Sequence, residues 1–312
     1  MNWLLWRQHR GQSLVAGIAI ALFALVVGIT GLHMAHEYDN AVNSCSTADG
    51  CQVVGQLFRG YGAIIDTVHL TIALPLILGL FFGVVLIGRE VEQSTNVLVW
   101  TQTVTRRRWL FLKVAFALGA TFVVSLAVSA LVTWWSGTPN SLNGNRFEGA
   151  QFDTQNLVPI AHALFAVALG IAAGALLRRT LPALALTVGL FAAVRIAVSV
   201  YLRPHYRAAV SQSFPIGTDR DVPSGSWTVT RALLDPASRP VNGAVRIADP
   251  CAGSIDRGGL DKCLGELGYR SVITYHPPSQ YWQFQLIESA LYLAVAAALV
   301  TFALVYTLRR DA

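Results

Sequence analysis

A polar segment with an ordered set of charges lies between two long apolar runs. The stretch GREVEQSTNVLVWTQTVTRRRW, residues 88–109, begins with two acids and ends with a basic block: Glu90 and Glu92, then Arg106, Arg107 and Arg108. Acids before a helix and bases after it complement the helix macrodipole, although each such charge contributes only about 0.3–1 kcal/mol. This order of charges is therefore the one that favours a short helix between the acids and the bases.

The interior of that segment has a helical pattern. Ser94–Thr103 contains no glycine or proline, and Val97, Trp100 and Val104 recur at helical spacing. The pattern predicts a short amphipathic helix lying across the membrane surface, with an apolar face that a soluble partner could bind as a helix in a groove. The alternative is a plain, positively charged inter-span loop whose pattern is fortuitous.

Sequence motifs for covalent chemistry are missing from the chain. It has no G-x-x-x-x-G-K-[ST] phosphate loop, no G-x-S-x-G elbow and no H-E-x-x-H metal motif. His33, His36 and His69 show no metal-ligand spacing, and solvated loop positions are the simpler interpretation. We therefore expect no catalytic residue, no metal site and no cofactor in this chain.

Two charged residues fall inside apolar segments. Arg195 lies about seven residues from one end of its segment and Glu288 about four residues into the last one. A rise of 1.5 Å per residue places them at depths that differ by roughly 5 Å, so they could pair and act as pathway or gating residues. Alternatively Arg195 snorkels outward and Glu288 sits at headgroup level.

The composition is that of an integral membrane protein. Hydrophobic residues make up 54% of the 312 residues and charged residues only 13%. Six segments are long enough to cross a hydrocarbon core that requires about 20 apolar residues: 13–34, 68–88, 110–135, 157–177, 181–202 and 285–308. The net charge is +6, but the basic residues form no stripe with interleaved aromatic residues. This argues against nucleic-acid binding.

The basic residues flanking the spans predict the orientation. One set of short flanks holds Arg7, Arg10, Arg89, Arg106, Arg107, Arg108, Lys113, Arg178, Arg179, Arg309 and Arg310, whereas the opposite set holds only Arg59 and Arg146. The positive-inside rule then places both termini in the cytoplasm. Arginine far outnumbers lysine and alanine and valine abound, which hints at a GC-rich bacterial genome and hence a bacterial plasma membrane.

The four cysteines fall on the face predicted to be external, where disulfides persist. Cys45, Cys51, Cys251 and Cys263 permit three pairings, of which 45–51 and 251–263 are favoured because each pair shares a loop. Free thiols are the alternative. The second pair lies in the largest polar stretch, 203–284, which holds eight prolines and is expected to form a small, loop-rich, disulfide-stapled extracellular domain.

Two further patterns have alternative explanations. Trp3, Trp6 and Arg10 predict a short amphipathic N-terminal helix in the inner membrane interface, unless they are an ordinary basic flank with interfacial tryptophans. Glycines spaced G-x-x-x-G, at Gly79 and Gly83 and again in span four, indicate close helix packing or a dimer seam.

Two motifs resemble a known family. The run GREVEQSTNVLVWTQTVTRRRWLFLK is similar to the cytoplasmic loop between spans two and three of actinobacterial permease subunits of the type-2 ABC-exporter superfamily. YHPPSQYWQFQLIESALYL resembles the start of the last span in the same permeases. Ser94 departs from the glycine expected before the threonine. The resemblance implies that the ATPase couples through Glu90, Glu92, Thr95, Val97, Trp100, Thr101, Val104, Arg106, Arg107 and Arg108.

What the resemblance implies is an all-α membrane protein of six spans, with residues 1–202 forming spans one to five, 203–284 an extracellular domain and 285–312 the last span and tail. Such a chain is the permease subunit of an ATP-driven exporter and is not itself an enzyme. ATP and Mg²⁺ would bind two copies of a separate ATPase subunit, and a second permease copy, giving a homodimer or a heterodimer, would complete the pathway. The rival is a membrane-anchored sensing or assembly protein whose cytoplasmic loop recruits a regulator. The cargo, whether drug, peptide or lipid, stays open.

Overall fold

The computed structural model describes residues 2–44, 62–85, 105–138, 146–147, 149–216, 222–241, 251 and 257–310. Within them six helices are long and apolar enough to cross a membrane, which confirms the predicted multi-span character. The chain divides into two compact units. One comprises Met1–Leu142, Gly149–Val198 and Gln285–Ala312, and the other Asn143–Glu148 and Ser199–Phe284.

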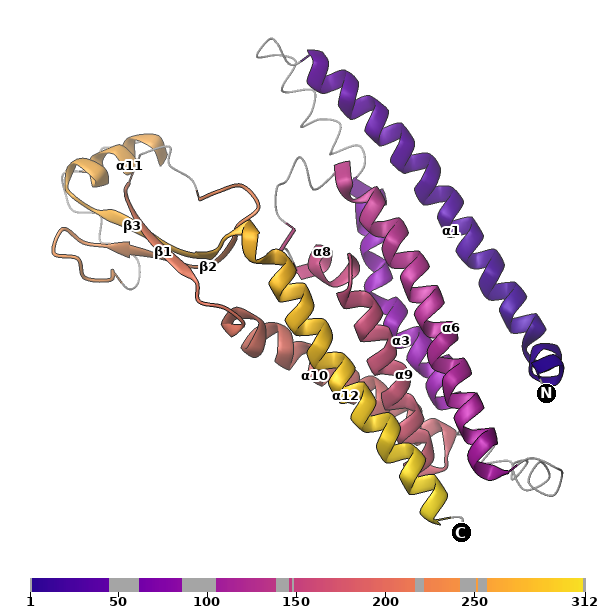
Figure 1. Ribbon diagram of the computed structural model, residues 1–312. Coiled ribbons are helices and arrows are strands. Elements are labelled where there is room, and N and C mark those ends of the chain that lie inside the picture. The colour runs from indigo at the N-terminus through magenta and orange to yellow at the C-terminus, as the bar shows by residue number, and fades with distance from the viewer. Residues whose placement is uncertain are drawn as a thin grey trace. The chain divides into compact units, whose positions relative to one another are not determined.

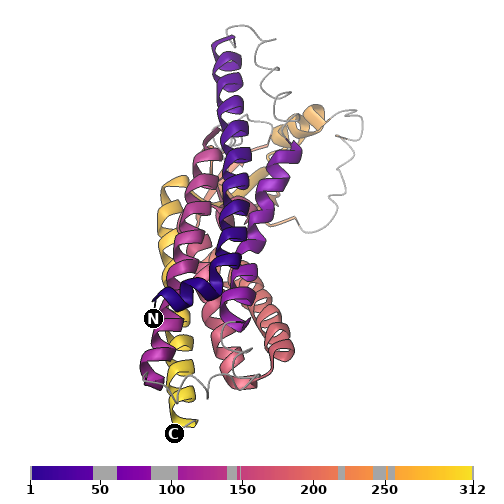
Figure 2. The same cartoon turned by 90° about the vertical axis from the view of Figure 1, so that its right-hand side faces the viewer.

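The spans are helical over most of their length (Figures 1 and 2), with these bounds: α1 Asn2–Ser44, the helical stretch Gly62–Val84, α6 Arg106–Trp135, α9 Val158–Leu177, α10 Thr180–Ala197 and α12 Tyr281–Arg310. Within Gly62–Val84 the winding changes from the 3-10 helix η1 (Leu70–Ala73) through α3 (Leu74–Leu78) to the π-helix η2 (Gly79–Val84). A short helix, α8 (Gly149–Thr154), precedes α9. Shorter turns flank α10 and α12: η3 Val198–Leu202, η4 Arg203–His205 and η6 Pro278–Gln280.

The first helix is longer than predicted. α1 runs without interruption from Asn2 to Ser44 and contains the candidate span Ile20–Asn40, which overlaps the predicted span 13–34. A separate amphipathic helix at the N-terminus is therefore not confirmed. The side chains of residues 2–16 lie outside the described part of the structure.

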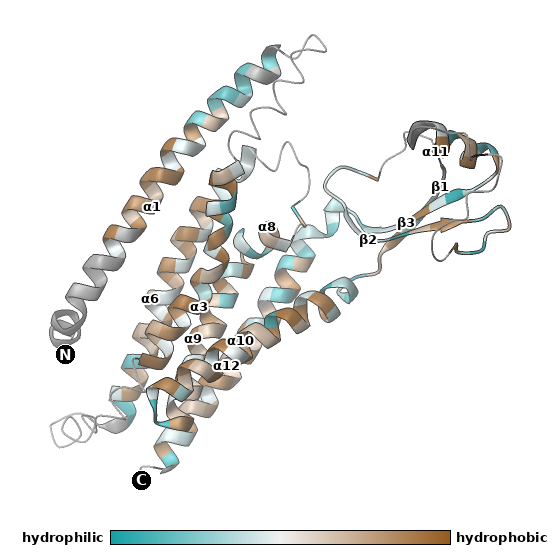
Figure 3. Cartoon of the chain, turned by 180° about the vertical axis from the view of Figure 1, so that it is seen from behind, coloured by the Kyte–Doolittle hydropathy of each residue, from teal (hydrophilic) through white to brown (hydrophobic). Residues whose placement is uncertain are grey.

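α9 forms the centre of the membrane unit. Of its most apolar stretch 83% is buried inside the protein, against 17% to 33% in the other five spans. α6, α10 and the α3–η2 helix all contact it. Apolar residues are abundant along these helices, as Figure 3 shows, and many on the outer helices are exposed, including Leu181 and Phe81. The exposed apolar surface is the surface that lipid would cover.

Glycines bring two helices into backbone contact. A Cβ atom added at Gly170 of α9 would lie 2.6 Å from the Gly79 carbonyl oxygen and 3.0 Å from the Gly83 Cα. A Cβ at Gly83 would lie 2.7 Å from the Val167 carbonyl oxygen. Gly79, Gly83 and Gly170 therefore pack against each other within one chain. Small residues permit such close approach of two helices in a membrane.

Replacing Gly170 with alanine is expected to destabilise the membrane unit by about 1–3 kcal/mol, because backbone atoms must move to admit the methyl group. Gly189 of α10 is the matched control, since an added Cβ there meets nothing within 4 Å. Thermal unfolding in detergent should show a lower Tm for Gly170→Ala and an unchanged or higher Tm for Gly189→Ala. Equal Tm values for the two variants would contradict the close packing.

The second unit contains an antiparallel sheet that the sequence analysis missed. Its strands are β1 Val210–Pro215, β2 Trp227–Leu234 and β3 Arg270–His276, in the order β1-β3-β2. Val210 lies opposite Tyr275, and Trp227 opposite His276. The eight prolines drew attention to loops, whereas the β-branched and aromatic residues of the segments WTVTRALL and RSVITYH were the available signal for strands.

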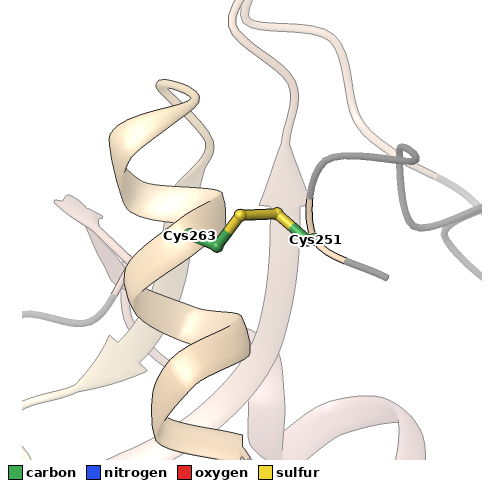
Figure 4. Close-up of a disulfide and its surroundings, with 2 residues drawn as sticks. All are labelled: Cys251 and Cys263. Carbon is green, nitrogen blue, oxygen red and sulfur yellow. A yellow bond between two sulfur atoms is a disulfide. The ribbon is translucent and has the colours of Figure 1, made fainter. Parts of the chain in front are cut away.

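A disulfide and an aromatic cluster hold the second unit together. Cys251 is bonded to Cys263 on the helix α11 (Arg257–Glu266), as predicted and as Figure 4 shows. Phe147 stacks on Trp227 with ring centroids 6.2 Å apart and meets Phe284 edge-on at 5.3 Å. A small domain needs such reinforcement because its own core is limited. The predicted partner pair, Cys45 and Cys51, lies outside the described residues.

Candidate functional site

Four elements of the membrane unit contribute one ionisable side chain each to a buried cluster. The residues are Asp153 of α8, His162 of α9, Arg195 of α10 and Glu288 of α12. Asp153 precedes the start of α9, His162 is in its second turn, and Arg195 lies in the last turn of α10. The cluster therefore lies near the end of the bundle at which α9 begins.

Arg195 forms an ion pair with Asp153. Nη2 of Arg195 donates to Oδ2 of Asp153, and Nη1 donates to the Ile72 carbonyl oxygen at 3.4 Å. The two side chains are 15% and 9% exposed. The sequence positions predict Glu288 as a possible partner of Arg195, whereas the structure pairs Arg195 with Asp153, a residue that precedes span four. The pair joins α8 to α10 and to the helix that carries Ile72.

His162 and Glu288 meet in the interior. Nε2 of His162 lies 3.5 Å from Oε1 of Glu288, and both side chains are fully buried. The imidazole packs edge-on against Tyr292, with ring centroids 4.4 Å apart. Neither ring nitrogen of His162 makes a hydrogen bond in the described structure. Glu288 is thus a buried acid of the membrane unit.

The turn between α8 and α9 is fixed by polar side chains from two other helices. Oε1 of Gln285 on α12 accepts hydrogen bonds from the backbone N–H groups of Leu157 (3.2 Å) and Val158 (3.0 Å). Ser129 and Thr133 of α6 bond the backbone of Asn156, which has a left-handed φ of 61°. These bonds satisfy groups at the start of α9 that have no partner within the helix.

The arrangement is suited to holding helices together at one end of the bundle. Ion pairs and hydrogen bonds in a low-dielectric interior are strong when formed and costly when broken, so they favour two discrete arrangements over gradual movement. Among the described residues no group of three His, Cys, Asp or Glu side chains could hold a metal ion. The ion pair and the buried contact between four helices favour a conformational role for the cluster.

Most of the predicted coupling residues lie outside the described residues: Glu90, Glu92, Thr95, Val97, Trp100, Thr101 and Val104. The backbone of Arg106 begins α6, and Arg107 and Arg108 are exposed in its first turn. One turn further on, Lys113 is buried and its Nζ lies 4.5 Å from the ring centroid of Trp109. The start of α6 therefore presents basic side chains at the surface, and the coupling helix itself stays a prediction.

Three residues at this site were not predicted from the sequence: Asp153, His162 and Gln285. His162 was visible as a polar ring within the apolar run VPIAHALFAVAL, and an ionisable residue inside a span marks a functional position by default. Gln285 was noticed only as part of a motif. Asp153 had no such signal, because it lies in the loop before the span and only the fold brings it to Arg195.

These features define a multi-pass membrane protein with a buried polar cluster in its helical unit. Residues 17–203 match the family profile described as ABC-2 membrane transporter related, which covers more than half of the chain. The chain belongs to this family of membrane transport components. No curated protein and no solved structure matches the sequence.

Proposed function

We propose that this chain is the permease subunit of an ATP-driven exporter in a bacterial plasma membrane. The observation that carries the proposal is the family match over residues 17–203 in a chain with six candidate spans. Two copies of a separate ATPase subunit would bind and hydrolyse ATP with Mg²⁺. A second permease copy, most simply an identical one, would complete the pathway, and the cargo would move outward between the two.

The segment 88–109 is the proposed docking site of the ATPase. Its predicted amphipathic helix would place Trp100 in a groove of the partner, while Glu90, Glu92 and Arg106–Arg108 frame it electrostatically. The motif resemblance supports this assignment, since the matching loop of type-2 permeases has the same position between spans two and three. The exposed side chains of Arg107 and Arg108 are compatible with it.

Arg195 and Glu288 are proposed to close one end of the pathway. In the predicted orientation both termini are cytoplasmic and the cluster lies toward the external side. Their partners Asp153 and His162 lie on α8 and α9, so breaking the two contacts would weaken the attachment of α10 and α12 to the centre of the bundle. Movement of helices between two packed arrangements is the usual basis of alternating access.

The predicted orientation can be checked with a membrane-impermeant thiol reagent. After mild reduction of intact cells, labelling is expected at Cys45, Cys51, Cys251 and Cys263, because all four are predicted to lie outside. Cysteine-to-serine variants assign the signal to each pair. Labelling that requires cell lysis would invert the proposed topology.

A pull-down of the chain with the products of neighbouring genes tests the function itself. An exporter subunit should retain an ATPase. Recovery of a regulator with no nucleotide-binding subunit would support the rival proposal of a sensing or assembly protein.

A further inference from the structure

We propose that the end of the membrane unit at which α6 begins binds an anionic phospholipid, whose headgroup is held by Arg107 and Arg108. The acyl chains of that lipid lie along the exposed apolar face of α6. The inference concerns this chain by itself, and it does not depend on the ATPase or on the direction of transport.

Arginine side chains gather at this end of the membrane unit. Those that the structure describes are in the first turn of α6, in the turn between α9 and α10, and at the end of α12: Arg107, Arg108, Arg178, Arg179 and Arg309. All of them are exposed except Arg178, which is partly buried. A guanidinium group can bind two phosphate oxygens at once through parallel N–H···O bonds, so this end is suited to a phosphate-bearing ligand.

One core cluster brings these three helix ends together. Trp109 of α6 and Ala175 of α9 belong to that cluster, and Leu308 of α12 packs against it. Each of these three residues lies within three positions of one of the arginines in the sequence. The arginines therefore surround a common end of the helical bundle, and their positive potentials add.

The acids of the membrane unit that the structure describes lie toward the opposite end: Glu37, Asp39, Asp66, Asp153 and Glu288. The helices that carry the first three pack there against the core cluster of Trp135, the last residue of α6. The other two belong to the polar cluster near the start of α9. Glu90, Glu92 and Asp311 lie outside the described residues. The described part of the arginine end is thus positively charged, which complements an anionic headgroup.

Arg107 and Arg108 continue the exposed apolar stripe of α6. Phe111, Phe122 and Leu126 are 64%, 45% and 45% exposed, and the candidate span of this helix begins at Arg107. With 3.6 residues per turn, the two arginines and the three apolar residues fall within about 100° of one another around the helix. Phe111 lies only about 5 Å along the axis from the arginines. A phospholipid can therefore contact the guanidinium groups and the apolar stripe at the same time.

The turn between α9 and α10 has the same combination of groups. Arg178 and Arg179 lie between two candidate spans, Val158–Leu177 and Thr180–His205. Leu181, just after them, is 78% exposed. Free phosphate would use the arginines alone, whereas a phospholipid also uses the apolar side chains beside them. The repeated pairing of exposed arginine with exposed apolar surface favours the lipid.

The test is the thermal stability of the purified chain in mixed micelles of an uncharged detergent and added phospholipid. Phosphatidylglycerol should raise Tm more than phosphatidylcholine with the same acyl chains, and inorganic phosphate should have no such effect. The variant Arg107→Gln with Arg108→Gln should bind phosphatidylglycerol about 30-fold more weakly, because each basic residue near an anionic surface contributes about fivefold.

Arg231→Gln with Arg239→Gln is the matched control, because it removes the same charge from exposed positions of the second unit. It should keep the wild-type response to phosphatidylglycerol. Equal responses to the two lipids, or a response that both double variants lose equally, would overturn the proposal. A rise in Tm that inorganic phosphate reproduces would assign the arginines to a free anion instead.

The same variants separate lipid binding from binding of the ATPase. If Arg107→Gln with Arg108→Gln fails to retain the ATPase in a pull-down but responds to phosphatidylglycerol like the wild-type chain, the arginines serve the ATPase and the lipid site is wrong. If this variant cannot be purified in folded form, the wild-type chain decides. Its preference for phosphatidylglycerol should disappear in about 1 M salt, where the screening length falls to about 3 Å, and a preference that persists contradicts the proposal.

Discussion

Replacing Arg195 with methionine is expected to destabilise the membrane unit by about 3–5 kcal/mol, the cost of leaving one partner of a buried ion pair uncompensated. Asp153 would lose its ion-pair partner Arg195 in a site where it is only 9% exposed. The Ile72 carbonyl oxygen would also lose a donor. The expected result is a large fall in Tm, or failure to accumulate in the membrane.

A double variant separates the ion pair from the packing of Arg195. Asp153→Leu combined with Arg195→Met removes both charges, and such a replacement is often close to neutral. The double variant should therefore recover much of the stability that either single variant loses. Arg231→Met is the matched control, because Arg231 is exposed on β2 and its loss should change Tm little. Additive losses in the double variant would show that the two side chains do not interact.

Replacing Trp100 with aspartate is expected to abolish retention of the ATPase subunit. In helix-in-groove recognition a central tryptophan typically contributes at least about 2 kcal/mol, so its loss weakens binding by about 30-fold or more. A buried aspartate adds a desolvation cost. Membrane insertion should be unaffected, because the predicted helix lies outside the spans. Co-purification with an ATPase from the neighbouring genes measures the effect.

Trp100→Phe is the conservative comparison. It retains an aromatic ring on the apolar face of the predicted helix and should preserve most of the ATPase in the pull-down. If the Trp100→Asp variant and the wild-type chain retain equal amounts of the ATPase, that result would contradict the proposed coupling role of residues 88–109.

The number of membrane spans could be predicted because span length and apolar composition are properties of local sequence. Six candidate spans and the bond between Cys251 and Cys263 agree with expectation. The continuous helix from Asn2 to Ser44 was not predicted. The polar residues on either side of the predicted span 13–34 were interpreted as breaks between that span and its neighbouring segments. Helices can extend beyond the bilayer without any change in their backbone pattern.

The polar cluster could be predicted only in part. Arg195 and Glu288 were singled out because charge is costly in a span, but their contacts depend on which helices meet. α9 lies at the centre because small residues such as Gly170 permit close approach, and this position brings His162 to Glu288. The short helix α8 brings Asp153 to Arg195. Such contacts are long-range, and no local pattern encodes them.

ATP hydrolysis in lipid tests the central claim most directly. A candidate ATPase subunit, such as one recovered in the pull-down, would be reconstituted in liposomes with the chain and without it, and its hydrolysis rate measured in both. The account predicts a stable complex whose ATP hydrolysis depends on the permease and is lost with Trp100→Asp. An ATPase that neither binds the chain nor changes its rate in its presence would contradict the account.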